Sequence, residues 1–220
     1  MEWSWTVVLD VMPKMLAGLV ITIQATFIGA ILAYVLGLML AILKMSKSKP
    51  LAFSVYWSSE FVRRTPLLVQ LYFLFYVLPD FGIFLEPFTA GVLGLGIHFS
   101  TYTSEVFRAG IENVPKGQWE AAKSLNYTPY QTMRYVILPQ AIPPMIPPLA
   151  NYLITMFKET PLLAAITVVE LFNAANIYSN SNYKYLEPMT LVGVFFLLVS
   201  VPAAIAANRL EQKFKPEEVR

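Results

Sequence analysis

The longest stretch without a charged side chain sets the class of this protein before any motif is considered. No Asp, Glu, Lys or Arg occurs from Met15 to Leu43, a run of 29 residues, or from Pro188 to Asn208, a run of 21 residues. About 20 apolar residues in a helix cross the hydrocarbon core of a bilayer. Charged residues make up 14% of the chain, against roughly one quarter in soluble domains. We therefore interpret the chain as an integral membrane protein.

Three further apolar segments lie between these two runs, which predicts an all-α fold with about five transmembrane helices. The segments are Leu51–Pro79, Phe88–Ser104 and Ala141–Val169. Glu60, Arg63 and Arg64 interrupt the first segment at helical spacing, so the acid can neutralise an arginine on the same face. Since only the 15 residues Thr65–Pro79 are free of charge, we expect a short second span that follows an interfacial lead-in.

Glycines and prolines shape the other two segments. Gly91, Gly94 and Gly96 allow neighbouring helices to approach closely. Proline is acceptable in the first turn of a helix and disruptive later, so the four prolines at 143, 144, 147 and 148 predict a helix that begins near Pro147 after an irregular entry. The polar residues from Asn173 to Glu187 predict a loop before the last span.

The distribution of basic residues predicts the orientation. With five spans and an outer N-terminus, 13 of the 16 Lys and Arg residues fall on the inner side and 3 on the outer side. Cytoplasmic loops carry the excess of Lys and Arg, so we place the N-terminus outside and the C-terminus in the cytoplasm. The inner set is Lys44, Lys47, Lys49, Arg63, Arg64, Arg108, Lys116, Lys123, Arg134, Arg209, Lys213, Lys215 and Arg220, and the outer set is Lys14, Lys158 and Lys184.

The chain lacks the signatures of the common enzyme sites. It has no cysteine, which excludes disulfides, zinc–cysteine sites and thiol nucleophiles. The patterns G-x-x-x-x-G-K-[ST], H-E-x-x-H and G-x-S-x-G do not occur in it. The single histidine, His98, is interpreted as a packed, hydrogen-bonded residue rather than a ligand or proton relay. We expect no enzymatic activity, cofactor or metal.

The polar section between the third and fourth apolar segments predicts two short helices joined by a tight turn. Gly117–Asn126 has the pattern of a short helix, and Asn126 suits the left-handed residue that closes it. Thr128, Pro129 and Gln131 then form the start of a second helix with a capping box. The pair is either a compact docking element on the inner side or a solvated interhelical loop.

The same section resembles a known signature. Glu120-Ala121-Ala122, then Asn126, then Val136-Ile137-Leu138-Pro139 follow the spacing of the EAA motif of ABC importer permeases, with Asn126 in place of glycine and Val136 in place of isoleucine. Further stretches are similar to the polar amino acid subfamily, and 182–190 resembles ectoine/hydroxyectoine permeases. The subfamily stretches are 63–70, 102–111, 138–141 and 158–163, and the resemblance covers about residues 12–215.

The resemblance implies a type I ABC importer permease fold, with one domain at about 12–215 and a cytoplasmic coupling loop at about 112–140. It implies a membrane-spanning permease subunit of an ATP-driven importer for a polar amino acid or related zwitterion, located in a bacterial inner membrane as a multi-pass protein. The implied partners are two ATP-binding subunits, a second permease chain (identical or similar), an extracytoplasmic solute-binding protein and membrane lipid, with no nucleic acid. The residues expected to couple to the ATPase are Trp119, Glu120, Ala121, Ala122 and Asn126.

Ionisable residues at membrane depth are candidate substrate sites, because burying them in a bilayer is costly. Lys158 and Glu159 lie between two apolar runs, and a lysine with an acid suits a zwitterion. Thr160 and Gln70 are expected to add neutral hydrogen bonds. The alternative is that Lys158 and Glu159 lie at the outer membrane interface.

Two other functional classes remain open from the sequence. One is a secondary transporter or channel subunit that works without an ATPase partner. The other is a scaffold or insertion subunit that has no transport path. Transport driven by an ion gradient would favour the first, and a complex that binds no solute would favour the second.

Overall fold

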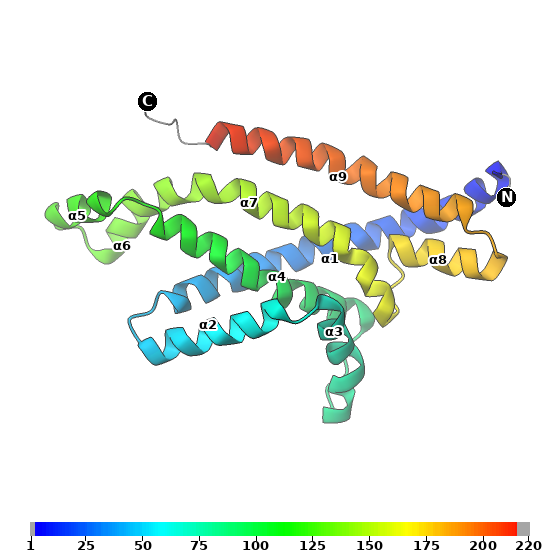
Figure 1. The fold of residues 1–220 in the computed structure, drawn as a ribbon, viewed down its shortest axis with the longest axis horizontal. Coiled ribbons are helices and arrows are strands. Elements are labelled where there is room, and N and C mark those ends of the chain that lie inside the picture. The colour runs from blue at the N-terminus through cyan, green and yellow to red at the C-terminus, as the bar shows by residue number, and fades with distance from the viewer. Residues whose placement is uncertain (1–2, 215–220) are drawn as a thin grey trace.

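The computed structural model describes residues 3–214, and the regular elements of this part of the chain are all helical (Figure 1), which confirms the predicted fold class. The long helices are α1 (Trp5–Lys44), α2 (Lys49–Arg64), α4 (Pro87–Glu112), α7 (Leu138–Glu159) and α9 (Leu186–Phe214). The short α-helices are α3 (Leu67–Tyr72), α5 (Lys116–Ser124), α6 (Pro129–Gln131) and α8 (Leu171–Asn182). Two π-helices, η1 (Phe73–Val77) and η3 (Thr132–Ile137), and two 3₁₀-helices, η2 (Leu78–Phe81) and η4 (Thr160–Ile166), complete the order.

Helices α1 and α4 pack against each other along the centre of the molecule. The Thr103 hydroxyl on α4 donates a hydrogen bond of 2.9 Å to the Ala33 carbonyl on α1. This approach needs Gly37, because a Cβ atom there would collide with the Thr103 hydroxyl. The predicted close approach at the α4 glycines is confirmed, since Gly91, Gly94 and Gly96 face Leu163, Leu71 and Leu32 respectively.

Two helices among the described residues, α1 and α9, are each long and apolar enough to cross a membrane. Two bent pairs reach that length and hydropathy together: α2 with Leu67–Phe81, bent by 100°, and Pro129–Ile166 with α8, bent by 46°. Helix α4 has 26 residues and lies at the position of the remaining expected span. The count of five spans stays a prediction.

The break between α2 and α3 lies where the sequence changes from charged to apolar. Pro66 disfavours a helical conformation in the residue before it, and Thr65 is accordingly extended, with φ −91° and ψ 132°. The Gln70 side chain secures the break by donating hydrogen bonds to the carbonyls of Val62 (2.7 Å) and Thr65 (3.0 Å). The sharp turn therefore follows directly after the two arginines.

The prediction of a helix start near Pro147 is wrong. Helix α7 runs without interruption from Leu138 to Glu159 and contains all four prolines. Ala141 and Met145 on this helix are buried against Ile111, Val114 and Ile137, and this packing helps to offset the hydrogen bonds that proline cannot make. Membrane proteins tolerate prolines in helices for the same reason, since neighbouring elements and local π or 3₁₀ adjustments accommodate them.

The prediction of a loop from Asn173 to Glu187 is also wrong, because its first part is helix α8. The Glu170 carboxylate caps this helix by accepting hydrogen bonds from the backbone N–H groups of Phe172 (2.9 Å) and Asn173 (2.7 Å). Apolar residues at helical spacing then pack on α1 beside Val11 and Met15, while Asn180, Ser181 and Asn182 at the end of the helix are exposed. The buried apolar residues of α8 are Leu171, Ala174, Ala175 and Tyr178.

The elements expected in the cytoplasm gather at one end of the molecule. Figure 1 shows α5, α6, the α1–α2 turn and the carboxyl end of α9 together on the left, and α8 with the start of α1 on the right. Most basic residues assigned to the inner side therefore share one end, which is compatible with the predicted orientation. Lys215 and Arg220, and the predicted domain end at 215, lie outside the described residues.

Candidate functional site

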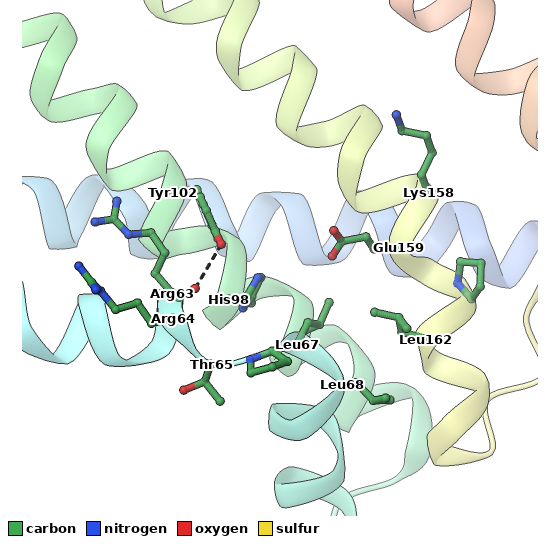
Figure 2. Close-up of a pocket in the computed structure, with 12 residues that line it drawn as sticks. Arg63, Arg64, Thr65, Leu67, Leu68, His98, Tyr102, Lys158, Glu159 and Leu162 are labelled. Atoms are coloured by element: carbon green, nitrogen blue, oxygen red, sulfur yellow. Dashed lines mark hydrogen bonds between the residues drawn. The ribbon is translucent and has the colours of Figure 1, made fainter.

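A cavity of about 530 Å³ lies where α2 ends, between α4 and the carboxyl end of α7 (Figure 2). One wall is the segment 63–68 around the α2–α3 break, a second is formed by His98 and Tyr102 on α4, and a third by the α7–η4 junction. The backbone is extended at the break and changes from α-helix to 3₁₀-helix at the junction, and polar side chains surround the cavity there. The residues of the third wall are Lys158, Glu159, Pro161 and Leu162.

Opposite charges line opposite walls of this cavity. The Glu159 carboxylate extends from α7 toward the side where Tyr102 and the two arginines lie, whereas the Lys158 side chain extends upward in the view (Figure 2). Arg63 and Arg64 stand at the last turn of α2 and line the facing wall. Glu159 makes no ion pair among the described residues. The sequence pointed to Lys158 as the cation for a zwitterion. The structure adds Arg63 and Arg64 to the lining of the same cavity, with guanidinium groups that extend away from Glu159 (Figure 2).

His98 is packed and hydrogen-bonded, as predicted. It is 8% exposed, and the Gln70 side-chain amide donates a hydrogen bond of 3.1 Å to its Nδ1 atom. That bond leaves the proton of a neutral imidazole on Nε2. The ring also borders the cavity and packs near Tyr102, with centroids 5.3 Å apart. His98 therefore lines the cavity with a polar aromatic ring in addition to its role in packing.

Gln70 and Thr160, the two neutral residues predicted to bind substrate, do not line the cavity. Thr160 is fully buried, and its hydroxyl donates a hydrogen bond of 2.8 Å to the Phe157 carbonyl. The Gln70 amide is occupied by the α2–α3 break and His98. Both side chains hold the walls of the cavity in place rather than pointing into it.

The two predicted short helices are present as α5 and α6, which with η3 form the coupling hairpin (residues 116–137). Asn126 has a left-handed backbone, with φ 55°. The capping box is complete, because the Gln131 side chain accepts from the Thr128 N–H (2.9 Å) and the Thr128 hydroxyl accepts from the Gln131 N–H (3.3 Å). Both local predictions are therefore confirmed.

The expected coupling residues occupy different faces of this hairpin. Trp119, Glu120, Ala121 and Asn126 are exposed, but Ala122 is only 1% exposed and helps to seat α5 on the rest of the hairpin. Four further large side chains are exposed on the hairpin, and sequence reasoning did not identify them: Leu125, Tyr127, Tyr130 and Tyr135. Exposed tryptophan and tyrosine side chains are typical of the anchors of a protein interface.

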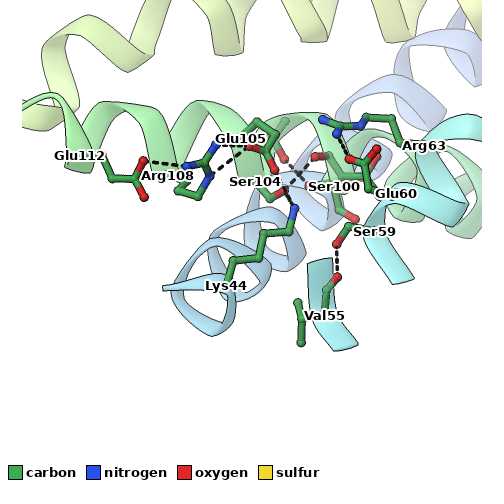
Figure 3. Close-up of polar contacts among 12 residues, drawn as sticks. Lys44, Val55, Ser59, Glu60, Arg63, Ser100, Ser104, Glu105, Arg108 and Glu112 are labelled. Carbon is green, nitrogen blue, oxygen red and sulfur yellow. Dashed lines mark hydrogen bonds and ion pairs between the residues drawn. The ribbon is translucent and has the colours of Figure 1, made fainter. Parts of the chain in front are cut away.

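An ion-pair network joins α1 to α4 on the hairpin side of the cavity (Figure 3). Lys44 lies 2.9 Å from Glu105, and Arg108 lies 2.7 Å from Glu105 and 2.6 Å from Glu112. Glu105 thus pairs with Arg108 on the same helix and with Lys44 on α1. Since these groups satisfy one another, they are structural rather than a second binding site.

Comparisons with known proteins agree with the interpretation of the chain as a membrane protein. Residues 33–216 match the family described as binding-protein-dependent transport system inner membrane component. The chain is 45% identical over 196 residues to the probable amino-acid ABC transporter permease protein y4tG of Sinorhizobium fredii, across 89% of this chain and 85% of that protein. It is 38% identical over 207 residues to the L-cystine transport system permease protein TcyB of Bacillus subtilis, across 91% of this chain and 88% of that protein.

A solved structure confirms the expected fold. The chain superposes on a structure described as "Crystal structure of an amino acid ABC transporter with histidines" with a TM-score of 0.89 and 35% identity, across 97% of this chain and 100% of that chain. The match to the family covers most of the sequence. The chain therefore belongs to the family of inner-membrane components of binding-protein-dependent transport systems, and its homologues are permeases of amino-acid ABC transporters.

Proposed function

We propose that this chain is the permease subunit of an ATP-driven importer that carries a zwitterionic amino acid across a bacterial inner membrane. The observation that carries the proposal is the cavity with Glu159 on one wall and Arg63 and Arg64 on the other. A guanidinium group matches a carboxylate in shape and charge, and Glu159 is an acceptor for an ammonium group. The cavity volume of about 530 Å³ falls in the usual range for small-molecule sites.

The names of the relatives support an amino acid as the solute. Besides the amino-acid and L-cystine permeases, the chain is 34% identical over 194 residues to the probable glutamine ABC transporter permease protein GlnM of Bacillus subtilis. The resemblance to ectoine/hydroxyectoine permeases concerns the segment 182–190 alone, which belongs to the end of α8 and the start of α9. Ectoine is also a zwitterion, so it belongs in the panel of solutes to be tested.

The coupling hairpin is the proposed contact with the ATPase. It lies at the end with most of the basic residues assigned to the inside (Figure 1), and it presents Trp119, Leu125, Tyr127 and Tyr130 to a partner. The proposed assembly has two ATP-binding subunits, two permease chains (identical or similar) and an extracytoplasmic solute-binding protein. The proposed permease domain is 12–215, with five spans, an outer N-terminus, an inner C-terminus and a coupling loop at about 112–140.

The test is transport in proteoliposomes that contain the complete complex with its ATPase and binding protein. We expect uptake of at least one amino acid from a panel of labelled polar amino acids and ectoine, and we expect that uptake to stop when ATP is withheld. Uptake driven by a sodium or proton gradient in the absence of ATP would instead show a secondary transporter. A complex that moves no member of the panel under either condition would contradict the proposed function.

A further inference from the structure

A second cavity, of about 370 Å³, lies between α4 and α7 next to the first cavity, which is the one lined by Glu159. On α4 the first cavity is lined by His98 and Tyr102, and the second by side chains from Tyr102 to Asn113. Tyr102 lines both cavities and is the only described residue that does so. The two cavities therefore follow each other along the same helix and meet at the Tyr102 ring.

Helix α7 shows the same order. It lines the second cavity from Pro144 to Tyr152 and the first cavity at Lys158 and Glu159. Pro144 lies near the start of α7, which follows the coupling hairpin, and Asn113 lies between α4 and α5. The second cavity therefore extends from the first cavity toward the coupling hairpin.

The rings of Tyr102 and Tyr152 lie at the boundary between the two cavities. Their centroids are 5.7 Å apart, within the range of packed aromatic pairs, so no amino acid fits between them in this arrangement. Both side chains are half-buried. The Tyr102 hydroxyl is fixed on the side of the first cavity, where it donates a hydrogen bond of 3.3 Å to the Arg63 carbonyl (Figure 2).

Two neighbouring residues of α1 hold the helices that carry these rings. The Thr103 hydroxyl on α4 donates a hydrogen bond of 2.9 Å to the Ala33 carbonyl, and the Tyr34 hydroxyl donates one of 2.9 Å to the Leu149 carbonyl on α7. Each of these bonds lies within one helical turn of its ring. The spacing of the rings is thus set by how α4 and α7 are held against α1, and a movement of α7 relative to α4 would separate them.

The second cavity is poorly suited to hold a zwitterion. Among the described residues that line it, Glu105 is the only charged one, and Glu105 is already paired with Lys44 at 2.9 Å and with Arg108 at 2.7 Å. In the first cavity, by contrast, Glu159 makes no ion pair among the described residues. A zwitterion that passed the two rings would find no free charge to retain it.

We propose that Tyr102 and Tyr152 form the inner gate of the transport path, and that the second cavity is the release path from the first cavity to the cytoplasm. The proposal rests on the proposed function, in which the first cavity is the amino-acid site and the coupling hairpin lies in the cytoplasm. Removal of one ring should join the two cavities. Phenylalanine in place of Tyr152 keeps the ring and should keep the gate closed.

The experiment measures access of a membrane-impermeant thiol reagent from the cytoplasmic side, which is possible because the chain has no cysteine. The sample is the complex of the permease with its ATPase subunits in inside-out membrane vesicles without nucleotide, and labelling is read on the permease chain. Leu162→Cys reports on the first cavity and Asn113→Cys on the second. With both tyrosines present, we expect Leu162→Cys to react at least about tenfold more slowly than Asn113→Cys, which corresponds to a barrier of about 1.4 kcal/mol.

The gate variants are Tyr152→Ala and the milder Tyr152→Leu. In both we expect the labelling rate at Leu162→Cys to rise about tenfold, because the barrier is removed, and the rate at Asn113→Cys to stay within about twofold. Tyr152→Phe should restore the slow rate at Leu162→Cys. A role of Tyr152 in folding alone would not predict this difference between the two reporters.

Two controls separate an open gate from a loosened structure. Ala41→Cys, at a fully buried position near the carboxyl end of α1, should stay unlabelled in every variant. Tyr183→Ala removes a ring that is 85% exposed at the end of the molecule opposite to the coupling hairpin, and should leave the rate at Leu162→Cys unchanged.

The outcomes distinguish this inference from the proposed function, because ATP-driven uptake of the amino-acid panel is measured on the same complex. A wild-type complex without uptake would overturn the proposed function and the gate with it. Wild-type uptake together with an unchanged rate at Leu162→Cys in Tyr152→Ala and Tyr152→Leu would overturn this inference alone. Labelling of Leu162→Cys as fast as Asn113→Cys with both tyrosines present would also overturn it, as would an equal rise at Ala41→Cys in both gate variants.

Discussion

The Lys44 ammonium group, at the carboxyl end of α1, lies 2.9 Å from the Glu105 carboxylate on α4, and the lysine side chain is only 4% exposed. The ammonium group also donates a hydrogen bond of 2.8 Å to the Ser104 hydroxyl. A buried lysine with two partners fixes the ends of α1 and α4 against each other. The joint lies one helical turn beyond Tyr102 on α4 and contributes no group to the cavity lined by Glu159.

We expect Glu105→Gln to lower the stability of the protein more than a neighbouring substitution of the same kind. The substitution leaves the buried Lys44 charge without its acid. We estimate a loss of about 2–3 kcal/mol in the free energy of unfolding. This is below the range for fully buried pairs, because the Glu105 side chain is 24% exposed. The matched control is Glu112→Gln, which breaks an exposed pair with Arg108 and should cost less than about 1 kcal/mol. Thermal unfolding in detergent measures both, and equal losses would contradict the assignment of the joint.

The two residues of the α7–η4 junction should differ in their importance for binding. We expect Glu159→Gln to lower amino-acid affinity about 10- to 100-fold, because the substrate ammonium group loses a charged partner. Lys158→Ala should change the affinity less than about threefold, since that side chain points upward in the view rather than across the cavity (Figure 2) and an exposed charge contributes little. Equilibrium binding to the purified complex measures both. A larger effect of Lys158→Ala would instead support the site expected from the sequence, in which Lys158 and Glu159 both bind the zwitterion.

The coupling hairpin offers a test that separates docking from folding. Trp119 and Glu120 are exposed in this chain. We expect Trp119→Ala and Glu120→Lys to reduce co-purification of the ATPase about tenfold or more, because tryptophans that become buried in an interface are frequent anchors. Ala122→Trp is unsuitable for this purpose, since Ala122 is 1% exposed and a large side chain there would disrupt the hairpin itself.

The control for the docking test is Tyr183→Ala, which removes an aromatic side chain that is 85% exposed at the opposite end of the molecule. It should leave ATPase recovery at the wild-type level. Full recovery in both hairpin variants, with uptake also unchanged, would place the docking surface elsewhere.

Orientation can be tested directly because the chain has no cysteine. Ser124 on the hairpin and Ser181 on α8 are both exposed, so Ser124→Cys and Ser181→Cys provide accessible thiols. In intact cells we expect an impermeant thiol reagent to label Ser181→Cys and to spare Ser124→Cys until the cells are opened. The reverse pattern would invert the orientation deduced from the charge distribution.

Local structure could be predicted from sequence wherever one short segment determines it. The left-handed Asn126 and the capping box of Thr128 and Gln131 depend on neighbours within a few residues, and both predictions are confirmed. Helix α8 was missed because its asparagines and serines suggested a loop. The spacing of Leu171, Ala174, Ala175 and Tyr178 shows its buried face in retrospect.

The site could be predicted only in part, because it is assembled from distant segments. Glu159 was found from its position between apolar runs. Arg63 and Arg64 were seen as partners of Glu60, but their place opposite Glu159 depends on the break before Pro66 and on a helix that continues through four prolines. The rules for proline alone predicted that α7 would begin near Pro147. Its packing against α4 outweighs this local preference.

The continuity of α7 has a mechanical consequence. One end of this helix leaves the coupling hairpin and the other end carries Glu159, with 22 residues between its limits. At 1.5 Å per residue the helix is about 33 Å long, so a tilt of about 5° around the hairpin end would displace Glu159 by about 3 Å. A displacement of that size makes or breaks a hydrogen bond. Under the proposed function, the helix would act as a lever arm, through which a partner that touches only the hairpin would alter how firmly the solute is held.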